Sequence, residues 1–372
     1  MSLFSGCGGL DLGLEQAGFR VVFATDLEQR CEDSYKANFP VTPFLRGHVN
    51  KLTRELMAEV SRGETDQEIA LLAGGPPCPA FSKSRFYRLE KPRALDDQLA
   101  EETLEGYLNV LQTLRPRAFL LENVFGFAYG VHRAALKYVL ETASSLGYTC
   151  NWQVLNAADY GVPQIRERFV LVGMQGQAFS FPQATHSKSP VADLFGPILL
   201  PWRTAGQAIG DLDTDDNADD KGHFAGGQYH QLLEQVPPGD NYLYFTDKRR
   251  HPNPVFKWRS RYWSFLLKLS PELPSWTIQA RRSNNMGPFH WRNRILRIEE
   301  VKSIQTFPRE WKLSGTVEQQ WRQLGNAVPP LLAAKLGEAL VHQLGFREAA
   351  TNATRTQTTT PTVSQRVLAG AG

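Results

Sequence analysis

The sequence predicts an α/β protein with a doubly wound, mostly parallel sheet and a smaller, irregular inserted domain. Three observations predict this. Short apolar runs alternate with longer amphipathic runs through the first half, a glycine-rich loop stands at the start, and Pro and Gly become frequent after about residue 178. Alternating strands and helices indicate a parallel sheet covered by helices. The rise in Pro and Gly after about residue 178 indicates where a second domain begins.

Four apolar runs are predicted to be strands. Each is apolar throughout, as expected of a strand that is covered on both faces. They span residues 20–25, 69–73, 118–121 and 169–172. Helical patterns lie at residues 104–114, 134–146 and 330–344. Gly147 ends the second of these helices.

The composition fits a soluble globular protein. Of 372 residues, 42% are apolar and 21% charged, which argues against a mostly disordered chain. No apolar run is long enough to cross a bilayer, and the N-terminus lacks the features of a signal peptide. We therefore expect a cytoplasmic protein with no membrane partner. The cysteines have irregular gaps that match neither a metal site nor a disulfide framework, so we expect free thiols and no metal. They are Cys7, Cys31, Cys78 and Cys150.

The even charge balance hides local segregation. The formal net charge is only +3, too small by itself to indicate nucleic-acid binding. Yet residues 248–263 carry six Lys or Arg and residues 281–297 carry five Arg, with no acid in either stretch. Residues 211–220 carry six Asp, and we expect this run to be a solvated loop turned away from any nucleic acid. The predicted units are a catalytic domain at 1–178, an inserted domain at 179–298, a return to the catalytic domain at 299–348 and a disordered tail at 349–372.

The glycine-rich start predicts a nucleotide site. Gly6, Gly8 and Gly9 allow close approach of the backbone to a ligand, and Asp26 follows Gly6 by 20 residues, where a ribose-binding carboxylate is expected. Asp11 stands where the dinucleotide fingerprint needs Gly or Ala, and no Gly-Lys-Ser/Thr follows. An adenosyl ligand without a pyrophosphate fits better, although a tight structural turn would also use these glycines.

Reactive side chains follow the predicted strands. Cys78 lies in a proline-rich loop after the strand at 69–73, a position that suits an aimed thiol as well as a buried filler. Glu122 ends the next strand, where its alternative role is a helix cap. Arg166 and Arg168 enter the strand at 169–172 and are expected to face the same side, either in a site or in a solvated ion pair.

Together these segments resemble the DNA (cytosine-5) methyltransferases of bacterial restriction-modification type. The resemblance runs from Met1 to about Gly345, apart from the variable middle, and its motifs occur in the family's order. They are FSGCGGLDLG, GGPPCPAFS, ENV, YGVPQIRERFVLVG and QLGNAVPP. The resemblance implies S-adenosyl-L-methionine as cofactor, a target cytosine flipped out of double-stranded DNA, and a middle region that reads the target sequence.

The resemblance also implies the roles of the reactive residues. Cys78 would add to carbon 6 of cytosine and so activate carbon 5. Glu122 would hold or protonate ring nitrogen 3. Arg168 would contact the base carbonyl, and Arg166 would support the site and its charge.

Two further sets of residues follow from the same resemblance. The cofactor-binding candidates are Phe4, Ser5, Gly6, Cys7, Gly8, Gly9, Leu10, Asp26, Leu27, His48, Val49, Pro77, Asn326, Ala327 and Val328. The DNA-binding candidates are Ser82, Lys248, Arg249, Arg250, Lys257, Arg259, Arg261, Arg281 and Arg282. The basic stretches could equally form a solvated surface. The resemblance also places the helix at 330–344 beside the opening strand.

Four features depart from the family's usual pattern. The chain begins three residues before the glycine motif, so either the central strand is short or the start lies upstream. His48 stands where an Asp is usual, and Leu27 where an aromatic residue commonly stacks on adenine. Pro79 follows Cys78 where Gln is common, which removes a side chain that could fill the space left by a flipped base.

Other functions remain open at this point. An RNA-directed relative would carry a Cys-Phe-Thr segment in its recognition region, which is not found here. A non-catalytic DNA-binding relative would tolerate the departures at Leu27 and His48, but it would not need Cys78 and Glu122. We expect double-stranded DNA as partner and action as a monomer. A cognate restriction endonuclease would require no physical contact.

Overall fold

The computed structural model describes residues 1–77, 98–129, 133–190, 198–214, 225–258 and 262–346. Its main sheet has seven strands among these residues, in the order β3-β2-β1-β4-β5-β8-β6. β8 runs antiparallel to both β5 and β6, and the other pairs are parallel. The strands are β1 (Ser2–Leu3), β2 (Ala24–Asp26), β3 (Phe44–Arg46), β4 (Leu71–Gly74), β5 (Ala118–Val124), β6 (Tyr148–Asn156) and β8 (Glu167–Gln175).

The predicted fold class, a mostly parallel α/β sheet, is confirmed. Each of the four predicted strands overlaps an observed one, with shifted ends. The run at 20–25 is a strand only from Ala24, whereas β5 and β8 extend beyond the apolar runs. The pattern missed β6, because most of this edge strand is exposed or half-buried and carries no continuous apolar signal.

The central strand β1 is very short. It pairs on one side with β2 and on the other with β4, with Leu3 opposite Thr25 and Gly74. The amine of Met1 donates to the carbonyl of Leu71 at 2.9 Å, which extends the contact between β1 and β4. A Cβ on Gly74 would lie 2.7 Å from the carbonyl oxygen of Leu3, so the two strands approach too closely for a larger residue.

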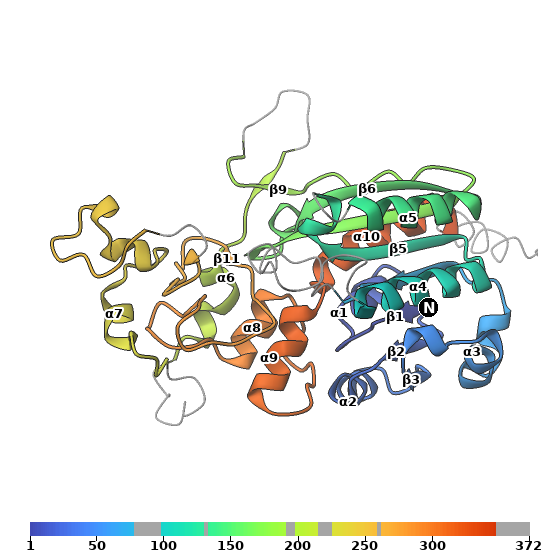
Figure 1. Ribbon diagram of the computed structural model, residues 1–372, viewed down its shortest axis with the longest axis horizontal. Helices are drawn as coiled ribbons and strands as arrows, with labels where there is room; N and C mark the ends of the chain where they lie inside the picture. Colours follow the sequence, from blue (N-terminus) through green and yellow to red (C-terminus); the bar gives the residue numbers. More distant parts are fainter. Residues whose placement is uncertain (78–97, 130–132, 191–197, 215–224, 259–261, 347–372) are drawn as a thin grey trace, which may run out of the picture.

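Helices cover both faces of the sheet. α10 lies on the opposite side of the sheet from α5 (Figure 1). The helices are α1 (Gly9–Gln16), α2 (Gln29–Asn38), α3 (Arg54–Ser61), α4 (Gln98–Leu114), α5 (Arg133–Ser145), α6 (Ala205–Ile209), α7 (His230–Gln235), α8 (Ile298–Ile304), α9 (Val317–Asn326) and α10 (Pro330–Gln343). The three helices predicted from the sequence fall on α4, α5 and α10. No helix in the described ranges is long and apolar enough to span a bilayer.

Alternation along β5 divides the core between the two faces. Phe119 and Leu121 belong to the cluster that contains α4 and α5, whereas Ala118 and Leu120 belong to the cluster that contains α1 and α10. All four side chains are fully buried. A strand with apolar residues on both faces is what a sheet covered on both sides requires.

The placement of α10 depends on α1. It packs closely on α1, the helix that follows β1. Glycines allow this approach. A Cβ on Gly13 would lie 2.3 Å from the carbonyl oxygen of Pro330, and one on Gly337 would lie 2.6 Å from the Cβ of Ala17. The two glycines therefore set the distance between the helices.

The segment between β8 and α8 contains little regular structure. Its short strands are β9 (His186–Ser187), β10 (Leu200–Pro201) and β11 (Ser275–Trp276). Aromatic rings form much of its core, with Phe256 and Phe265 centred 5.4 Å apart and Tyr229 packed against both. β11 pairs in parallel with β7 (Gln164–Ile165), which joins this segment to the chain just before β8.

The expectation of a solvated acidic run is wrong for Asp213. Its side chain is only 14% exposed, accepts from Nε1 of Trp291 at 2.8 Å and pairs with Nε of Arg292 at 2.5 Å. Asp211 pairs with Arg309. The sequence pattern could not reveal these partners, because they lie some 80 to 100 residues away. The rest of the run, from Asp215 to Asp220, lies outside the described residues.

The contact between α1 and α10 predicts the effect of adding one methyl group. Gly13→Ala should lower the free energy of unfolding by about 1–3 kcal/mol, since the new Cβ meets backbone that must move. Chemical denaturation of the purified variant measures this. Gly210→Ala is the control, because its φ is −61° and a Cβ there meets nothing within 4 Å. Equal stability of both variants would contradict the close contact.

Candidate active site

A cleft of about 1500 Å³ opens at the carboxyl ends of β1, β2, β4 and β5. The sheet order changes direction between β1 and β4, and open α/β sheets bind ligands at such a point. The cleft exceeds the ~300–1,000 Å³ typical of a site for one small molecule. It therefore has room for a cofactor together with a nucleobase.

The glycine loop after β1 forms one wall of the cleft. Gly6 has a φ of +56°, and a Cβ there would point into open space, so the backbone itself faces the cleft. Its amide donates to one carboxylate oxygen of Asp26 at 2.9 Å, and the amide of Glu28 donates to the other at 2.9 Å. Burial raises the pKa of Asp26. Asp26 thus fixes the loop and still lines the cleft.

Most of the predicted cofactor residues meet in this cleft. Those that line it are Phe4, Ser5, Gly6, Gly9, Leu10, Asp26, Leu27, His48, Val49, Pro77, Asn326, Ala327 and Val328. Cys7 and Gly8 do not. The Cys7 carbonyl accepts from Nε1 of Trp311 at 3.1 Å, and burial raises the pKa of its thiol to about 12. A Cβ on Gly8 would lie 2.5 Å from the ring of Phe39, so both residues support the loop from behind.

The wall of the cleft formed around the glycine loop fits an adenosyl group. Like Gly6, Gly47 lines the cleft, and a Cβ there would meet nothing within 4 Å. These two glycines leave a cradle that larger residues would partly fill. The carboxylate of Asp26 beside it suits ribose hydroxyls, and Leu27 and Val49 supply apolar surface for a flat ring.

A carboxylate and a guanidinium that line the same cleft form an ion pair. Nε of Arg168 lies 2.8 Å from Oε1 of Glu122, and their side chains are 12% and 10% exposed. Burial raises the pKa of Glu122, and the charges of Arg168 and Arg166 oppose the rise. The carboxyl therefore holds a proton at higher pH than an ordinary glutamate.

The proline-rich loop approaches this pair. A Cβ on Gly75 would lie 2.8 Å from Oε2 of Glu122, so the loop leaves β4 in contact with the carboxylate. Asn123 is fully buried, and its Nδ2 donates to the carbonyl of Pro76 at 3.3 Å. Pro77 lines the cleft, and Cys78 follows it directly. Cys78 itself lies outside the described residues.

Arg166 has a different environment from Arg168. It is fully buried, does not line the cleft, and precedes β8. Its guanidinium donates to the carbonyls of Ile278 at 3.0 Å, Gly325 at 2.8 Å and Ala327 at 2.9 Å. The two arginines predicted to act from one side therefore have separate partners, and Arg166 joins the entrance of β8 to two distant segments.

Sequence reasoning missed the buried amide of Gln164. Its Nε2 donates to Oε1 of Gln305 at 2.8 Å, and its Oε1 accepts from the amide of Ile278 at 2.9 Å. These bonds hold the segment after β11 against β7. The only signal was its place in the PQIRER motif, since its partners are more than 100 residues away.

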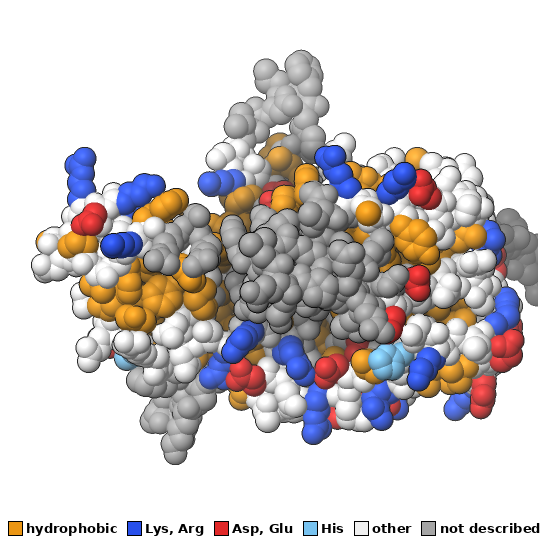
Figure 2. Space-filling view, in the orientation of Figure 1, with side chains coloured by type: hydrophobic (Ala, Val, Ile, Leu, Met, Phe, Trp, Pro, Cys, Tyr) orange, Lys and Arg blue, Asp and Glu red, His pale blue; other side chains and the backbone are white. Residues whose placement is uncertain are grey.

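The predicted DNA-binding residues of the first basic stretch lie on the surface. Lys248, Arg249, Arg250 and Lys257 are exposed. Nζ of Lys248 lies 4.5 Å from the ring centre of Trp258. Figure 2 shows Lys and Arg side chains at the outer end of the part that carries α7. Ser82, Arg259 and Arg261 lie outside the described residues.

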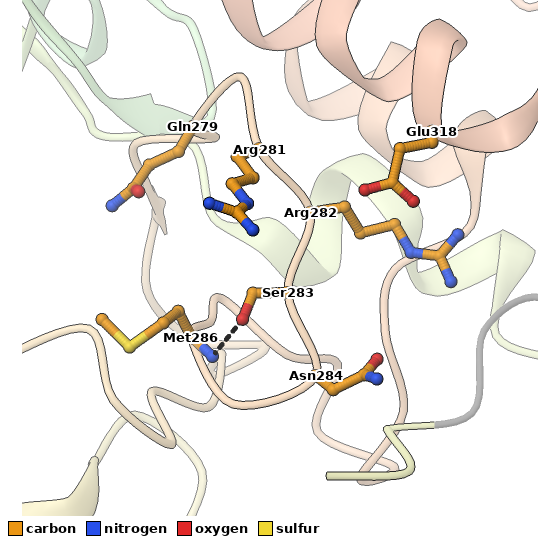
Figure 3. Close-up of a pocket in the computed structure, with 7 residues that line it drawn as sticks. All are labelled: Gln279, Arg281, Arg282, Ser283, Asn284, Met286 and Glu318. Carbon is orange, nitrogen blue, oxygen red and sulfur yellow. Dashed lines mark hydrogen bonds between the residues drawn. The ribbon is translucent and has the colours of Figure 1, made fainter.

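Arg281 and Arg282 line a separate groove of about 530 Å³. Figure 3 shows Glu318 of α9 extending toward the loop that carries both arginines. Ser283 Oγ accepts from the amide of Met286 at 3.2 Å and closes this loop (Figure 3). Arg281 is exposed and also lines the large cleft, so its side chain borders both cavities.

Comparison with known proteins identifies the family. The model of the protein family described as "C-5 cytosine-specific DNA methylase" matches residues 1–342 of this chain. The chain belongs to this family. The methylase is 38% identical over 370 residues to the type II methyltransferase M.SacI of Streptomyces achromogenes, and the match covers 93% of each chain. It is 30% identical to M1.HphI of Haemophilus parahaemolyticus, over 92% of this chain and 86% of that one.

Solved structures support the fold of the methylase. The S. pombe Dnmt2 methyltransferase superposes with a TM-score of 0.61 at 17% identity, over 93% of this chain and 98% of that one. The family assignment confirms the function predicted from the motifs: the chain is a DNA (cytosine-5) methyltransferase. Its methyl donor is S-adenosyl-L-methionine, and DNA is its substrate.

The buried position of Arg166 predicts a large loss of stability on its removal. Arg166→Met should lower the free energy of unfolding of the methylase by about 3 kcal/mol or more, because three buried carbonyls lose a charged donor. Urea denaturation measures the change. Arg309→Ala is the control, since its side chain is 58% exposed and its ion pair with Asp211 is solvated, and it should change little. A loss no greater than that of the control would contradict the structural role.

Proposed function

We propose that the methylase modifies one cytosine within a specific double-stranded DNA sequence, as the methyltransferase of a type II restriction-modification system. M.SacI and M1.HphI are both named type II methyltransferases. The observation that carries the proposed mechanism is the buried pair of Glu122 and Arg168. It shares one cleft with the glycine loop and with the segment that leads to Cys78.

Cys78 is the proposed nucleophile. Carbon 5 of cytosine is a poor nucleophile until a thiolate adds to carbon 6. This addition forms a carbon–sulfur bond and moves the ring electrons toward nitrogen 3, where a proton from Glu122 neutralises them. The resulting enamine is nucleophilic at carbon 5. Once carbon 5 is methylated, loss of its proton and departure of the Cys78 thiolate restore the ring.

Glu122 and Arg168 have complementary roles in this step. The raised pKa of Glu122 suits a group that gives a proton to nitrogen 3. Arg168 is positioned by its bond to Glu122, and its guanidinium suits the neighbouring carbonyl of the base. Arg166 is proposed as a positioning residue, because its charge reaches Glu122 while its hydrogen bonds hold the backbone.

When bound, S-adenosyl-L-methionine supplies a methyl group on a positively charged sulfur. The glycine loop and Asp26 would hold its ribose side, and Leu27 and Val49 would contact the adenine ring. His48 lines the same cleft, where its imidazole would accept a hydrogen bond from the adenine amino group. Asn326 would close the cofactor side.

Recognition of the target is assigned to residues 179–298, between the catalytic segments 1–178 and 299–348. Arg281 is the proposed base-reading residue, since it is exposed and borders the cleft. Lys248, Arg249, Arg250 and Lys257 would contact phosphates, with Ser82, Arg259, Arg261 and Arg282 as further candidates. We propose that the methylase acts as a monomer in the bacterial cytoplasm. A cognate endonuclease would need no contact with it.

Expression in a bacterial host tests the function and the nucleophile together. DNA from cells that make the wild-type methylase should contain 5-methylcytosine at one recurring sequence, read by bisulfite sequencing. Cys78→Ala should leave the same sites unmethylated, because the proposed nucleophile is removed. The purified variant should still bind DNA that contains the target. Methylation that persists in this variant would overturn the proposed mechanism.

The raised pKa of Glu122 predicts a pH dependence. Since the protonated carboxyl is the acid, single-turnover methyl transfer should fall as pH rises through the pKa of Glu122. Glu122→Gln has no proton to transfer, so its rate should be at least about 100-fold lower and should lack this fall. The amide can still accept from Arg168, which preserves the pairing. A fall with pH that is unchanged in the variant would assign the titration to another group.

A further inference from the structure

Two tryptophans stand together at the mouth of the cleft. The ring centres of Trp263 and Trp276 lie 5.1 Å apart, with their planes tilted by 57°. Both line the cleft, and they are 40% and 38% exposed. Glu122 and Arg168 line the same cleft with side chains 10% and 12% exposed. The aromatic pair therefore lies nearer to solvent than the ion pair.

Trp276 is fixed to the catalytic segment. It ends β11 and lies opposite Ile165 of β7, three residues before Arg168. On either side of it, the amide of Ser275 donates to the carbonyl of Pro163 at 2.9 Å, and Oγ1 of Thr277 donates to the carbonyl of Ile165 at 2.7 Å. These bonds fix the backbone of Trp276 relative to β7, and therefore relative to Arg168 three residues further along the chain.

Trp263 supports this position from a second segment. Its carbonyl accepts from Nδ2 of Asn241 at 2.7 Å, which holds its backbone. Tyr262, beside it, also lines the cleft. Exposed large aromatic rings that gather at one place indicate a binding surface. Flat rings of this size stack well on nucleobases.

We propose that Trp276, braced by Trp263, enters the DNA duplex and stacks in the space that the target cytosine leaves. This inference rests on the proposed function, because it requires a flipped base. Extruding a base loses its stacking on its neighbours, and a flat aromatic ring inserted in its place restores part of that stacking. Pro79, next to the nucleophile, has no extended side chain that could do so. The rigid indole at the cleft mouth takes this role.

The test compares two DNA duplexes that carry the target found by bisulfite sequencing. In one the target cytosine pairs with guanine, and in the other it faces adenine, so that it flips at lower cost. Trp276→Ala should reduce kcat/KM by about 10- to 100-fold on the paired duplex, the scale of one lost base–aromatic stack. On the mismatched duplex the same variant should lose less than about threefold in kcat/KM. Trp263→Ala should show the same trend more weakly.

Two further comparisons keep the result interpretable. Trp276→Phe retains a flat ring and should keep most activity on the paired duplex, whereas Trp276→Leu should behave like Trp276→Ala. Trp152→Ala is the matched control, because Trp152 is also 38% exposed but lies on β6, and it is not among the described residues that line the cleft. Its activity should equal that of the wild type on both duplexes.

The outcomes separate the two claims. An equal loss on both duplexes, or no loss on the paired one, would overturn the role of Trp276 while leaving the methyltransferase function intact. Equal activity of the Phe and Leu variants on the paired duplex would overturn it as well. A wild-type protein that methylates neither duplex would instead contradict the proposed function.

Discussion

The geometry of the site depends on the hydrogen bonds that the guanidinium of Arg166 donates. It is fully buried, and it donates hydrogen bonds to the backbone carbonyls of Ile278, Gly325 and Ala327. These carbonyls belong to segments that are 112 to 161 residues away in sequence. A single buried cation therefore holds together the strand that carries Arg168, the segment after β11 and the C-terminal end of α9, which carries Asn326.

The charge of Arg166 also affects a neighbour. Glu122 experiences two guanidiniums, with Arg168 in direct contact, while burial opposes its ionisation. Burial raises the pKa of the Glu122 carboxyl and the two positive charges oppose that rise, so the buried charges around it control how readily it holds a proton. Structural support and the proposed proton transfer thus depend on the same buried charges.

The sequence predicted the parts of the site that parallel strands bring together. Gly6, Asp26 and Glu122 each follow or end a strand, and the carboxyl ends of parallel strands meet at one edge, so their convergence in one cleft follows from the fold class. Contacts made by irregular chain were not predictable in this way. Asp213 was expected in solvent because its run carries six Asp and no base, but its partners Trp291 and Arg292 lie 78 and 79 residues further along the chain. The pairing of β11 with β7 likewise leaves no local pattern.

That pairing explains how an irregular segment, here the proposed recognition segment, can position side chains precisely at the cleft. Loops position side chains poorly unless a regular element holds them. Here β11 takes its register from β7, and β7 leads directly to Arg166 and then to β8. Gln164 bonds to both Ile278 and Gln305, which closes the same junction from within. The backbones of Trp276 and Arg168 are therefore held in a fixed relation to one another. If Trp276 displaces the target base as proposed, the two residues of strand pairing would couple the opening of the target to the chemistry at Arg168.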